Sequence, residues 1–390
     1  MDRRQFVKNA GIVALFSDLA MTQNYSMTGN AKEIRVTRTG SNFEREKLAR
    51  PLGLKGGYLS ELWQIVSKLQ SSSGISRTGL ATQSVLYGDA DLFAAYPEAE
   101  GNARMYVLTN KALDLVKQTG FTTPIDLFEK ILPEMKKESV RMTGKQDLNI
   151  NYIYNALVSI DNAAWLLYAA ENKLSAMDEM IPEPFRKALA HHYDKIAIMY
   201  TVPYGMPVQE VKHAAEQGFF VFKIKTGYPG TQPEMLEKDK VRLSEIHNAL
   251  KDMRTEHTPD GKLRYTMDAN TRYEKKESLM RYLEHAKKIG AFRQILLYEE
   301  PLHENNDEDV KDVGVRIAGD ESVHDEAGVS RRLQQGYSAI VLKGIAKTLS
   351  LSLRIARLAH ERNVPCLCAD LTVNPILVDW HKNLAGVCHE

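Results

Sequence analysis

Residues 263–301 read LRYTMDANTRYEKKESLMRYLEHAKKIGAFRQILLYEEP, and this stretch decides the fold. Two short apolar runs, 263–270 and 295–301, each end in acidic residues. Between them, residues 277–290 carry apolar side chains at three- and four-residue intervals, as an amphipathic helix does. An apolar strand buried on both faces, then a helix, then a second such strand is typical of parallel β-sheets.

The same unit recurs from residue 191 onward. The expected strands are 196–203, 219–227, 263–270, 295–301, 315–321, 339–344 and 365–371. The expected helices are 207–218, 234–253, 277–290, 307–314, 326–336 and 349–363. So many consecutive units exceed half of a doubly wound sheet, and they favour a TIM-type barrel over residues 191–390.

The end of this repeat departs from a complete barrel. After a last helix at 374–385, only residues 386–390 remain. We therefore expect a modified (β/α)7β barrel that lacks its eighth strand. Closure would then need a partner between the first and seventh strands, because open strand edges are unpaired.

Residues 31–190 have a different pattern of apolar residues, which predicts a mixed α+β domain that is mainly helical. Residues 33–40 alternate apolar and polar side chains as a half-buried strand does. Helical spacing is read at 61–70, 127–140 and 150–171. The segment 181–185, IPEPF, contains two prolines and is interpreted as the linker to the barrel.

Composition excludes several classes of function. Lysine and arginine total 51 against 50 acidic residues, so no global field favours nucleic acid or an anionic membrane. The mean hydropathy is −0.36, and no uncharged apolar run reaches the roughly 20 residues of a membrane-spanning helix. The cysteines are Cys366, Cys368 and Cys388, which do not form a disulfide framework.

The first residues, MDRRQFVK, resemble a twin-arginine export signal. Arg3 and Arg4 are followed by bulky apolar Phe6 and basic Lys8, and an apolar stretch begins at residue 10. We therefore expect residues 1–25 to be a signal segment that directs the folded protein to the periplasm. The alternative is the basic N-terminus of a cytoplasmic protein.

Charged and polar residues stand at the carboxyl ends of the predicted strands, where βα loops build the active sites of barrels. They are Lys223, Lys225, Asp268, Asn270, Glu299, Glu300, Asp320, Glu321 and Lys343. Each follows an apolar run, and buried charges must compensate one another or bind an ion.

Three acidic strand ends can converge on one cation. Carboxylate ligation suits Mg²⁺, with Mn²⁺ as the alternative, whereas zinc is disfavoured by the absence of histidine and cysteine there. Lys223 and Lys225 are two positions apart on one strand and share a face. Their mutual repulsion and a nearby cation would lower a lysine pKa toward the range of a useful base. Lys343 approaches the same space from the opposite side of the barrel.

Five motifs in order are similar to those of the enolase superfamily, within it the muconate-lactonizing and dipeptide-epimerase subgroup. They are FKIKTG (222–227), MDAN (267–270), YEEPL (298–302), AGDES (318–322) and VLKGIAK (341–347). The helix NALVSIDNAAW (155–165) resembles the last helix of the family's capping domain. Each motif closes a predicted strand, which makes a chance match of all five improbable. The resemblance implies an α+β capping domain at 31–190 followed by the barrel.

The resemblance also implies roles for the strand-end residues. The metal ligands would be Asp268, Glu299 and Asp320, and the acid/base pair would be Lys225 and Lys343. Lys223 would tune Lys225 by its charge. The outer residues of the metal cluster would be Asn270, Glu300 and Glu321.

The chemistry implied is removal of a proton alpha to a carboxylate, through an enediolate, with return on the opposite face. This is epimerisation or racemisation of a small carboxylate or a dipeptide such as L-Ala-L/D-Glu. Family members with a histidine at strand seven are disfavoured, because residues 365–371 read PCLCADL and end near Asp370. Cycloisomerases and o-succinylbenzoate synthases use the same lysines and remain alternatives. The resemblance also implies a homo-oligomer.

Two features depart from the family pattern. Lys347 follows Lys343 by four residues where the family has a spacing of three. The expected loss of the eighth strand allows a catalytically impaired barrel that only binds a ligand. Arg77, Tyr58 and the loop 71–79 are interpreted either as a substrate lid or as a plain surface loop.

Overall fold

The structure is a computed structural model that describes residues 32–55, 57–369 and 373–388. The predicted signal segment, 1–25, and Asp370 lie outside the described residues. Within the described part, no helix is both long enough and apolar enough to cross a membrane.

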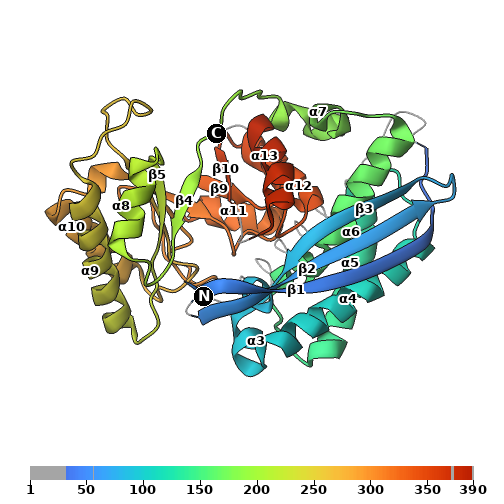
Figure 1. Cartoon of the computed structure of the whole chain (residues 1–390), viewed down its shortest axis with the longest axis horizontal. Helices are drawn as coiled ribbons and strands as arrows, with labels where there is room; N and C mark the ends of the chain where they lie inside the picture. The colour runs from blue at the N-terminus through green and yellow to red at the C-terminus, as the bar shows by residue number, and fades with distance from the viewer. Residues whose placement is uncertain (1–31, 56, 370–372, 389–390) are drawn as a thin grey trace, which may run out of the picture. The chain divides into compact units, whose positions relative to one another are not determined.

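The N-terminal domain is built on a three-stranded antiparallel sheet in the order β1-β2-β3 (Figure 1). Its strands are β1 (Val36–Leu54), β2 (Gly57–Ser71) and β3 (Ser76–Gln83). The predicted strand at 33–40 is confirmed, but the helix expected at 61–70 is wrong because this segment lies in β2. Ile65 and Leu69 are fully buried on one face of the strand while Lys68 is exposed. The apolar residues of this segment match both a period of two and a helical period, and pairing with β1 and β3 decides between them.

Three long helices lie on one side of this sheet, and the first and third of them contact its strands (Figure 1). They are α4 (Glu98–Gln118), α5 (Pro124–Thr143) and α6 (Ile150–Asn172), which confirms the predictions at 127–140 and 150–171. α6 packs closest to the sheet. A Cβ atom at Gly79 would lie 2.2 Å from the carbonyl oxygen of Ser159. Only glycine therefore permits this approach of β3 to α6. Two short helices, α2 (Val85–Gly88) and α3 (Ala90–Ala95), precede α4.

The segment that connects the two domains is ordered. It contains α7 (Met177–Met180) and the 3₁₀ helix η1 (Glu183–Leu189), so the expected linker at 181–185 is part of a packed element. Phe185 is buried, and the Arg357 guanidinium lies 5.3 Å from the centre of its ring. This contact joins the connection to the barrel.

The second domain is a curled parallel sheet of seven strands whose spatial order follows the sequence. The strands are β4 (Met199–Val202), β5 (Val221–Lys225), β6 (Arg264–Asp268), β7 (Ile295–Glu299), β8 (Arg316–Gly319), β9 (Ala339–Leu342) and β10 (Cys366–Cys368). Every predicted strand is confirmed. β4 and β10 form the two edges of this sheet in the described residues. The predicted fold class, a capping domain with a modified TIM-type barrel, is confirmed.

Helices follow most of these strands. They are α8 (Val208–Glu216), α9 (Gln232–Leu250), α10 (Lys276–Lys288), α11 (Glu326–Gln334), α12 (Leu349–Glu361) and α13 (Pro375–Val387), with a 3₁₀ turn η2 (Phe292–Gln294) before β7. The short helix expected at 307–314 is wrong, because this segment forms turns. Its acidic residues instead bind groups outside the segment, such as Arg331 at Asp307 and Lys276 at Asp312, or a local backbone N–H, that of Lys311 at Asp309.

One apolar core crosses from the capping domain into the barrel. It contains Trp165 of α6 together with Leu349 and Leu353 of α12, all nearly inaccessible to solvent. At this contact Asp161 accepts hydrogen bonds from the backbone N–H groups of Leu349 and Ser350, at the start of α12. The contact fixes the capping domain on the carboxyl side of the barrel.

Candidate active site

Parallel pairing brings the predicted site residues together at one end of the barrel. Lys225 of β5 pairs in register with Asp268 of β6, and Asp268 pairs with Glu299 of β7. Asp320 directly follows β8, and Lys343 directly follows β9. The three carboxylates are completely buried, and Lys343 is 7% exposed. The expectation that these charges compensate one another is met by the ion pairs they form.

The lysines of β5 bind the neighbouring carboxylates. The Lys223 ammonium lies 3.0 Å from Asp268 Oδ2 and 2.5 Å from Glu299 Oε2, so it bridges two of the predicted metal ligands. The Lys225 ammonium lies 2.5 Å from the same oxygen of Asp268 and donates to Asn270 Oδ1 at 3.0 Å. Both lysines therefore point to the same side of β5, as the spacing of two predicts.

On the other side of the barrel, two lysines bind Asp320. Lys343 donates to Asp320 Oδ2, and its ammonium is 4.0 Å from Glu299 Oε1. Lys347 lies 2.9 Å from Asp320 Oδ1. Lys347 was not among the predicted site residues. Its position four residues after Lys343, across a turn in which its N–H donates to the Lys343 carbonyl, places it here.

Burial and charge move the lysine pKa values in different directions. For Lys225, burial and the charge of Lys223 outweigh the attraction of Asp268, and its pKa is lowered. For Lys223, burial alone would lower the pKa, but Asp268 and Glu299 raise it above the ordinary value. Burial would also lower the pKa of Lys343, which Asp320 and Glu321 instead raise. Lys225 is therefore the lysine best suited to lose its proton.

The carboxylates suit a divalent cation by their chemistry. Asp268, Glu299 and Asp320 offer only oxygen donors, and the buried Glu299 Oε1 has no hydrogen-bond partner. Their positions, however, are those of a lysine-bridged cluster. Among the described residues, no three histidine, cysteine, aspartate or glutamate side chains are placed to hold a metal ion together. A bound cation would need Lys223 to move from between Asp268 and Glu299.

The residues predicted to surround the metal ligands, Asn270, Glu300 and Glu321, form hydrogen bonds at the ends of the strands. Asn270 has a positive φ of 46°, donates to Glu321 Oε1 at 2.9 Å and binds Asp268 through its backbone N–H. Glu300, with φ 37°, accepts from the backbone N–H of Asp320 at 2.6 Å. The buried Arg332 lies 3.3 Å from Glu300. Glu300 thus points toward the scaffold behind β8, whereas Glu321 points toward the cavity.

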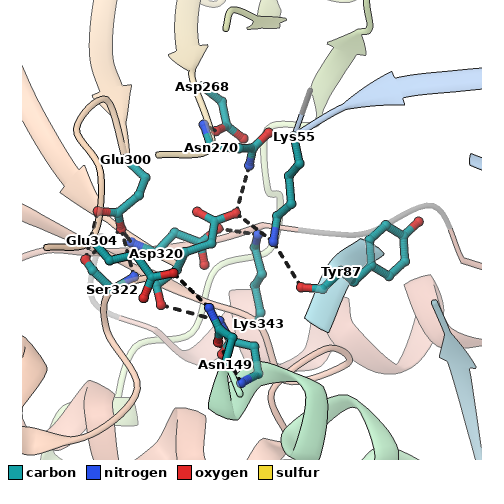
Figure 2. A network of polar contacts seen from close by, with 12 residues as sticks. Lys55, Tyr87, Asn149, Asp268, Asn270, Glu300, Glu304, Asp320, Ser322 and Lys343 are labelled. Carbon is teal, nitrogen blue, oxygen red and sulfur yellow. Dashed lines mark hydrogen bonds and ion pairs between the residues drawn. The ribbon is translucent and has the colours of Figure 1, made fainter. Parts of the chain in front are cut away.

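The capping domain contributes a cation that the sequence did not indicate. Lys55 lies in the turn between β1 and β2, pairs with Glu321 Oε1 at 3.2 Å and donates to the carbonyl of Tyr87. Figure 2 shows Lys55 reaching toward the row of carboxylates at the end of the barrel. The only local signal in the sequence is the turn motif LKGG at 54–57.

Most of these groups line a cavity of about 780 Å³ between the capping domain and the barrel, whereas Asp268, Glu299 and Glu300 do not. From the cap, the lining includes Arg50, Leu54, Lys55, Tyr87, Asn151 and Asn155. From the barrel it includes Lys223, Lys225, Asn270, Asp320, Glu321, Lys343 and Lys347. The lid expected from Arg77, Tyr58 and 71–79 does not line it. The turn 71–75 lies at the opposite end of β2 from Lys55.

Comparison with known proteins supports this architecture. Residues 207–387 match the sequence profile of a family described as enolase C-terminal domain-like. No curated protein sequence matches the chain.

Solved structures share the fold at low sequence identity. A dipeptide epimerase from Enterococcus faecalis V583, complexed with Mg and L-Leu-L-Tyr, has a TM-score of 0.64 and 15% identity, covering 90% of this chain and 87% of its own. The substrate-liganded L-Ala-D/L-Glu epimerase from Bacillus subtilis has a TM-score of 0.65 and 16% identity, with the same coverage. L-Talarate dehydratase from Polaromonas sp. JS666, complexed with Mg and L-glucarate, has a TM-score of 0.60 and 14% identity, covering 90% and 84%.

Proposed function

Residues 207–387 match the enolase C-terminal domain-like family, and from this match we propose that the protein is an isomerase that moves the proton alpha to a substrate carboxylate. The observation that carries the proposal is the placement of Lys225 and Lys343. They stand at the ends of β5 and β9, on opposite sides of the curled sheet, and both line the same cavity. A substrate carbon between them is open to proton removal on one face and proton return on the other.

The reaction needs one lysine that accepts a proton and one that donates a proton, and the pKa values of Lys225 and Lys343 are shifted in the directions that suit these two roles. Lys225, whose pKa is lowered, takes the proton as a general base. Lys343, whose pKa is raised, keeps its proton and donates it to the opposite face. Lys223 stays charged beside Lys225 and keeps the pKa of Lys225 low. In the reverse direction the two lysines exchange roles.

A divalent cation held by Asp268, Glu299 and Asp320 would stabilise the negative charge that develops on the substrate carboxylate. We propose Mg²⁺, because the ligands are carboxylates and because relatives of the same fold were solved with Mg. The ammonium groups of Lys223 and Lys343 now share these carboxylates. Displacing these ammonium groups therefore reduces the net binding free energy of the cation.

The cavity favours an anionic substrate of dipeptide size. A volume of about 780 Å³ accommodates a small ligand. Its lining holds more basic than acidic side chains, although Lys55, Lys225 and Lys343 pair with Glu321, Asp268 and Asp320, and Arg50 pairs with Glu210. We propose a dipeptide with a second carboxylate, such as L-Ala-L/D-Glu. Cycloisomerase or o-succinylbenzoate-synthase-like chemistry with the same lysines is the alternative within the fold.

Hydrogen exchange tests the proposal. The purified protein is incubated in D₂O with Mg²⁺ and a panel of dipeptides, and the α carbon is followed by NMR and by chiral analysis. Deuterium incorporation with inversion, and without loss of water or ring closure, is the expected result. Binding of a dipeptide without any exchange would instead identify a catalytically impaired barrel.

We also propose that Arg3 and Arg4 direct export to the periplasm as a folded protein. Substituting both arginines by lysine should keep the protein in the cytoplasm, as measured by cell fractionation. An unchanged distribution would contradict export by this route. The oligomeric state proposed from the family, a homo-oligomer, is tested by light scattering of the purified protein.

A further inference from the structure

A further buried carboxylate, Asp239, lies behind the strand that carries Lys225. Asp239 is on α9 and is 1% exposed, and it lies outside the cluster of predicted metal ligands. Its two oxygens accept from the backbone N–H of Gly227 at 3.1 and 2.9 Å. Oδ2 also accepts from the Tyr273 hydroxyl at 2.7 Å. Burying a carboxylate costs free energy unless hydrogen bonds satisfy it, and for Asp239 one of the donors is the backbone of the turn after β5.

A chain of hydroxyl groups leads from Asp239 back to the same turn. The Tyr298 hydroxyl donates to that of Tyr273 at 3.3 Å, and it lies 2.8 Å from Thr226 Oγ1. Both tyrosines are completely buried, and Thr226 is 1% exposed. Thr226 and Gly227 directly follow Lys225 in the sequence. Asp239 therefore holds this segment twice, directly at Gly227 and through the tyrosines at Thr226.

The turn has little freedom to shift while these bonds persist. The Tyr204 hydroxyl donates to the carbonyls of both Thr226 and Gly227 at 2.9 Å. Gly227 has φ +84°, and a Cβ there would lie 2.7 Å from Arg272 Cβ. The backbone N–H of Thr226 donates to the carbonyl of Asp268. The backbone N–H and carbonyl groups of both Thr226 and Gly227 are thus all hydrogen-bonded.

We infer that Asp239 is a positioning residue, which fixes the backbone after β5 and thereby aims the Lys225 ammonium into the cavity. This inference rests on the proposed function, because the consequence of aiming Lys225 is proton transfer on one face of the substrate. Lys343, on β9, makes none of these contacts. Loss of Asp239 should therefore affect the two faces unequally, which general damage to the fold would not do.

The test compares the two enantiomers of one substrate. Lys225→Ala first identifies the enantiomer whose proton faces Lys225. In Asp239→Asn, we expect α-proton exchange from that enantiomer to fall about tenfold or more and exchange from the other to stay within about twofold, because small misplacements of a catalytic group are costly. Equal losses for both enantiomers would overturn the inference.

Tyr273→Phe provides a second variant if Asp239→Asn does not fold. It removes one donor to Asp239 and breaks the hydroxyl chain. The exchange rates of the two enantiomers should therefore again be affected unequally, but the difference should be smaller. Glu237→Gln is the matched control, since Glu237 is on the same helix with a side chain that is 69% exposed. It should leave both exchange rates unchanged.

A readout that needs neither metal nor turnover separates this inference from the proposed function. The metal-free protein is treated with an amine-acetylating reagent, and the modification rates of Lys225 and Lys343 are measured by peptide mass spectrometry. Asp239→Asn should change the rate at Lys225 by a factor of about ten and the rate at Lys343 by less than about two. If the wild-type protein exchanges no substrate, the proposed function fails. An unchanged rate at Lys225 overturns the inference about Asp239.

Discussion

Lys55 in the cap hairpin and Glu321 beyond β8 form an ion pair of 3.2 Å across the mouth of the barrel. Glu321 Oε1 also accepts from Asn270, whereas its Oε2 has no hydrogen-bond partner. The side chains of Lys55 and Glu321 are only 14% and 5% exposed. The capping domain therefore supplies a counter-ion for a carboxylate that the barrel alone leaves partly unsatisfied.

We predict that Lys55→Met destabilises the protein by about 2 kcal/mol, because it removes the ion-pair partner of a buried carboxylate. Urea unfolding of Lys55→Met, Glu321→Gln and the double variant measures the coupling. In the double variant most of this loss should be recovered. Additive effects of the two substitutions would show that the pair contributes nothing to the link between the domains.

Mg²⁺ should compete with Lys223 for the carboxylates of Asp268 and Glu299. We predict that Mg²⁺ raises the unfolding temperature of the wild-type protein, with a stabilisation of about 3 kcal/mol at a hundredfold excess over Kd. The rise should be larger in Lys223→Met, because the competing ammonium is gone, and should vanish in Glu299→Gln. Differential scanning fluorimetry measures all three. An equal rise in Glu299→Gln would exclude Glu299 as a ligand.

The strand ends of the barrel were predictable because several buried apolar runs stop at charged residues. This pattern indicated Asp268, Lys343 and the acidic pairs 299–300 and 320–321, whereas the choice of Glu299 and Asp320 as metal ligands came from the family resemblance. Parallel pairing brings these residues together. The pattern did not reveal whether the charges pair with one another or with an ion. That depends on side-chain positions, which place Lys223 between Asp268 and Glu299.

The capping domain was harder to predict. Residues 61–70 fit a helical period as well as a strand period, and only pairing with β1 and β3 makes them a strand. The contribution of Lys55 depends on where the β1–β2 turn meets the barrel, which no local pattern encodes. The loop 71–79 was interpreted either as a lid, because the family's capping domain reaches over the barrel mouth, or as a surface loop, and its serine- and glycine-rich composition indicates only a turn at one or other end of a hairpin.

The cap–barrel contact at Asp161 should make stability depend on pH. Burial raises the pKa of Asp161 from its ordinary value of 3.8 to about 6. The folded chain thus retains this proton to higher pH than the unfolded chain. Its contribution is complete below about pH 4 and is lost as the pH rises to about 6, a change on the order of 3 kcal/mol.

Asp161→Asn should remove this dependence, because asparagine stays neutral and can still accept from the N–H groups of Leu349 and Ser350. We therefore predict that the stability of the variant relative to wild type increases between pH 4 and pH 7, as measured by urea unfolding at both values. Asp114→Asn, at a side chain that is 61% exposed, is the control and should show no such trend. A parallel pH dependence in Asp161→Asn and wild type would contradict the role of Asp161.

Finally, the two lysines should be separable by stereochemistry. Lys343→Ala removes the acid on one face but leaves the ion pair between Lys225 and Asp268, since the Lys343 ammonium binds a different carboxylate, Asp320. We predict that this variant loses epimerisation by a factor of about 10³ or more, because a positioned acid or base contributes factors of that order. It should still exchange the α proton of the enantiomer that faces Lys225. Lys225→Ala should show the opposite preference.

A different outcome would contradict this assignment. If either variant lost exchange from both enantiomers while its metal-induced stabilisation persisted, one lysine would have to serve both faces. The separation of the two lysines across the sheet would then not be the basis of the reaction.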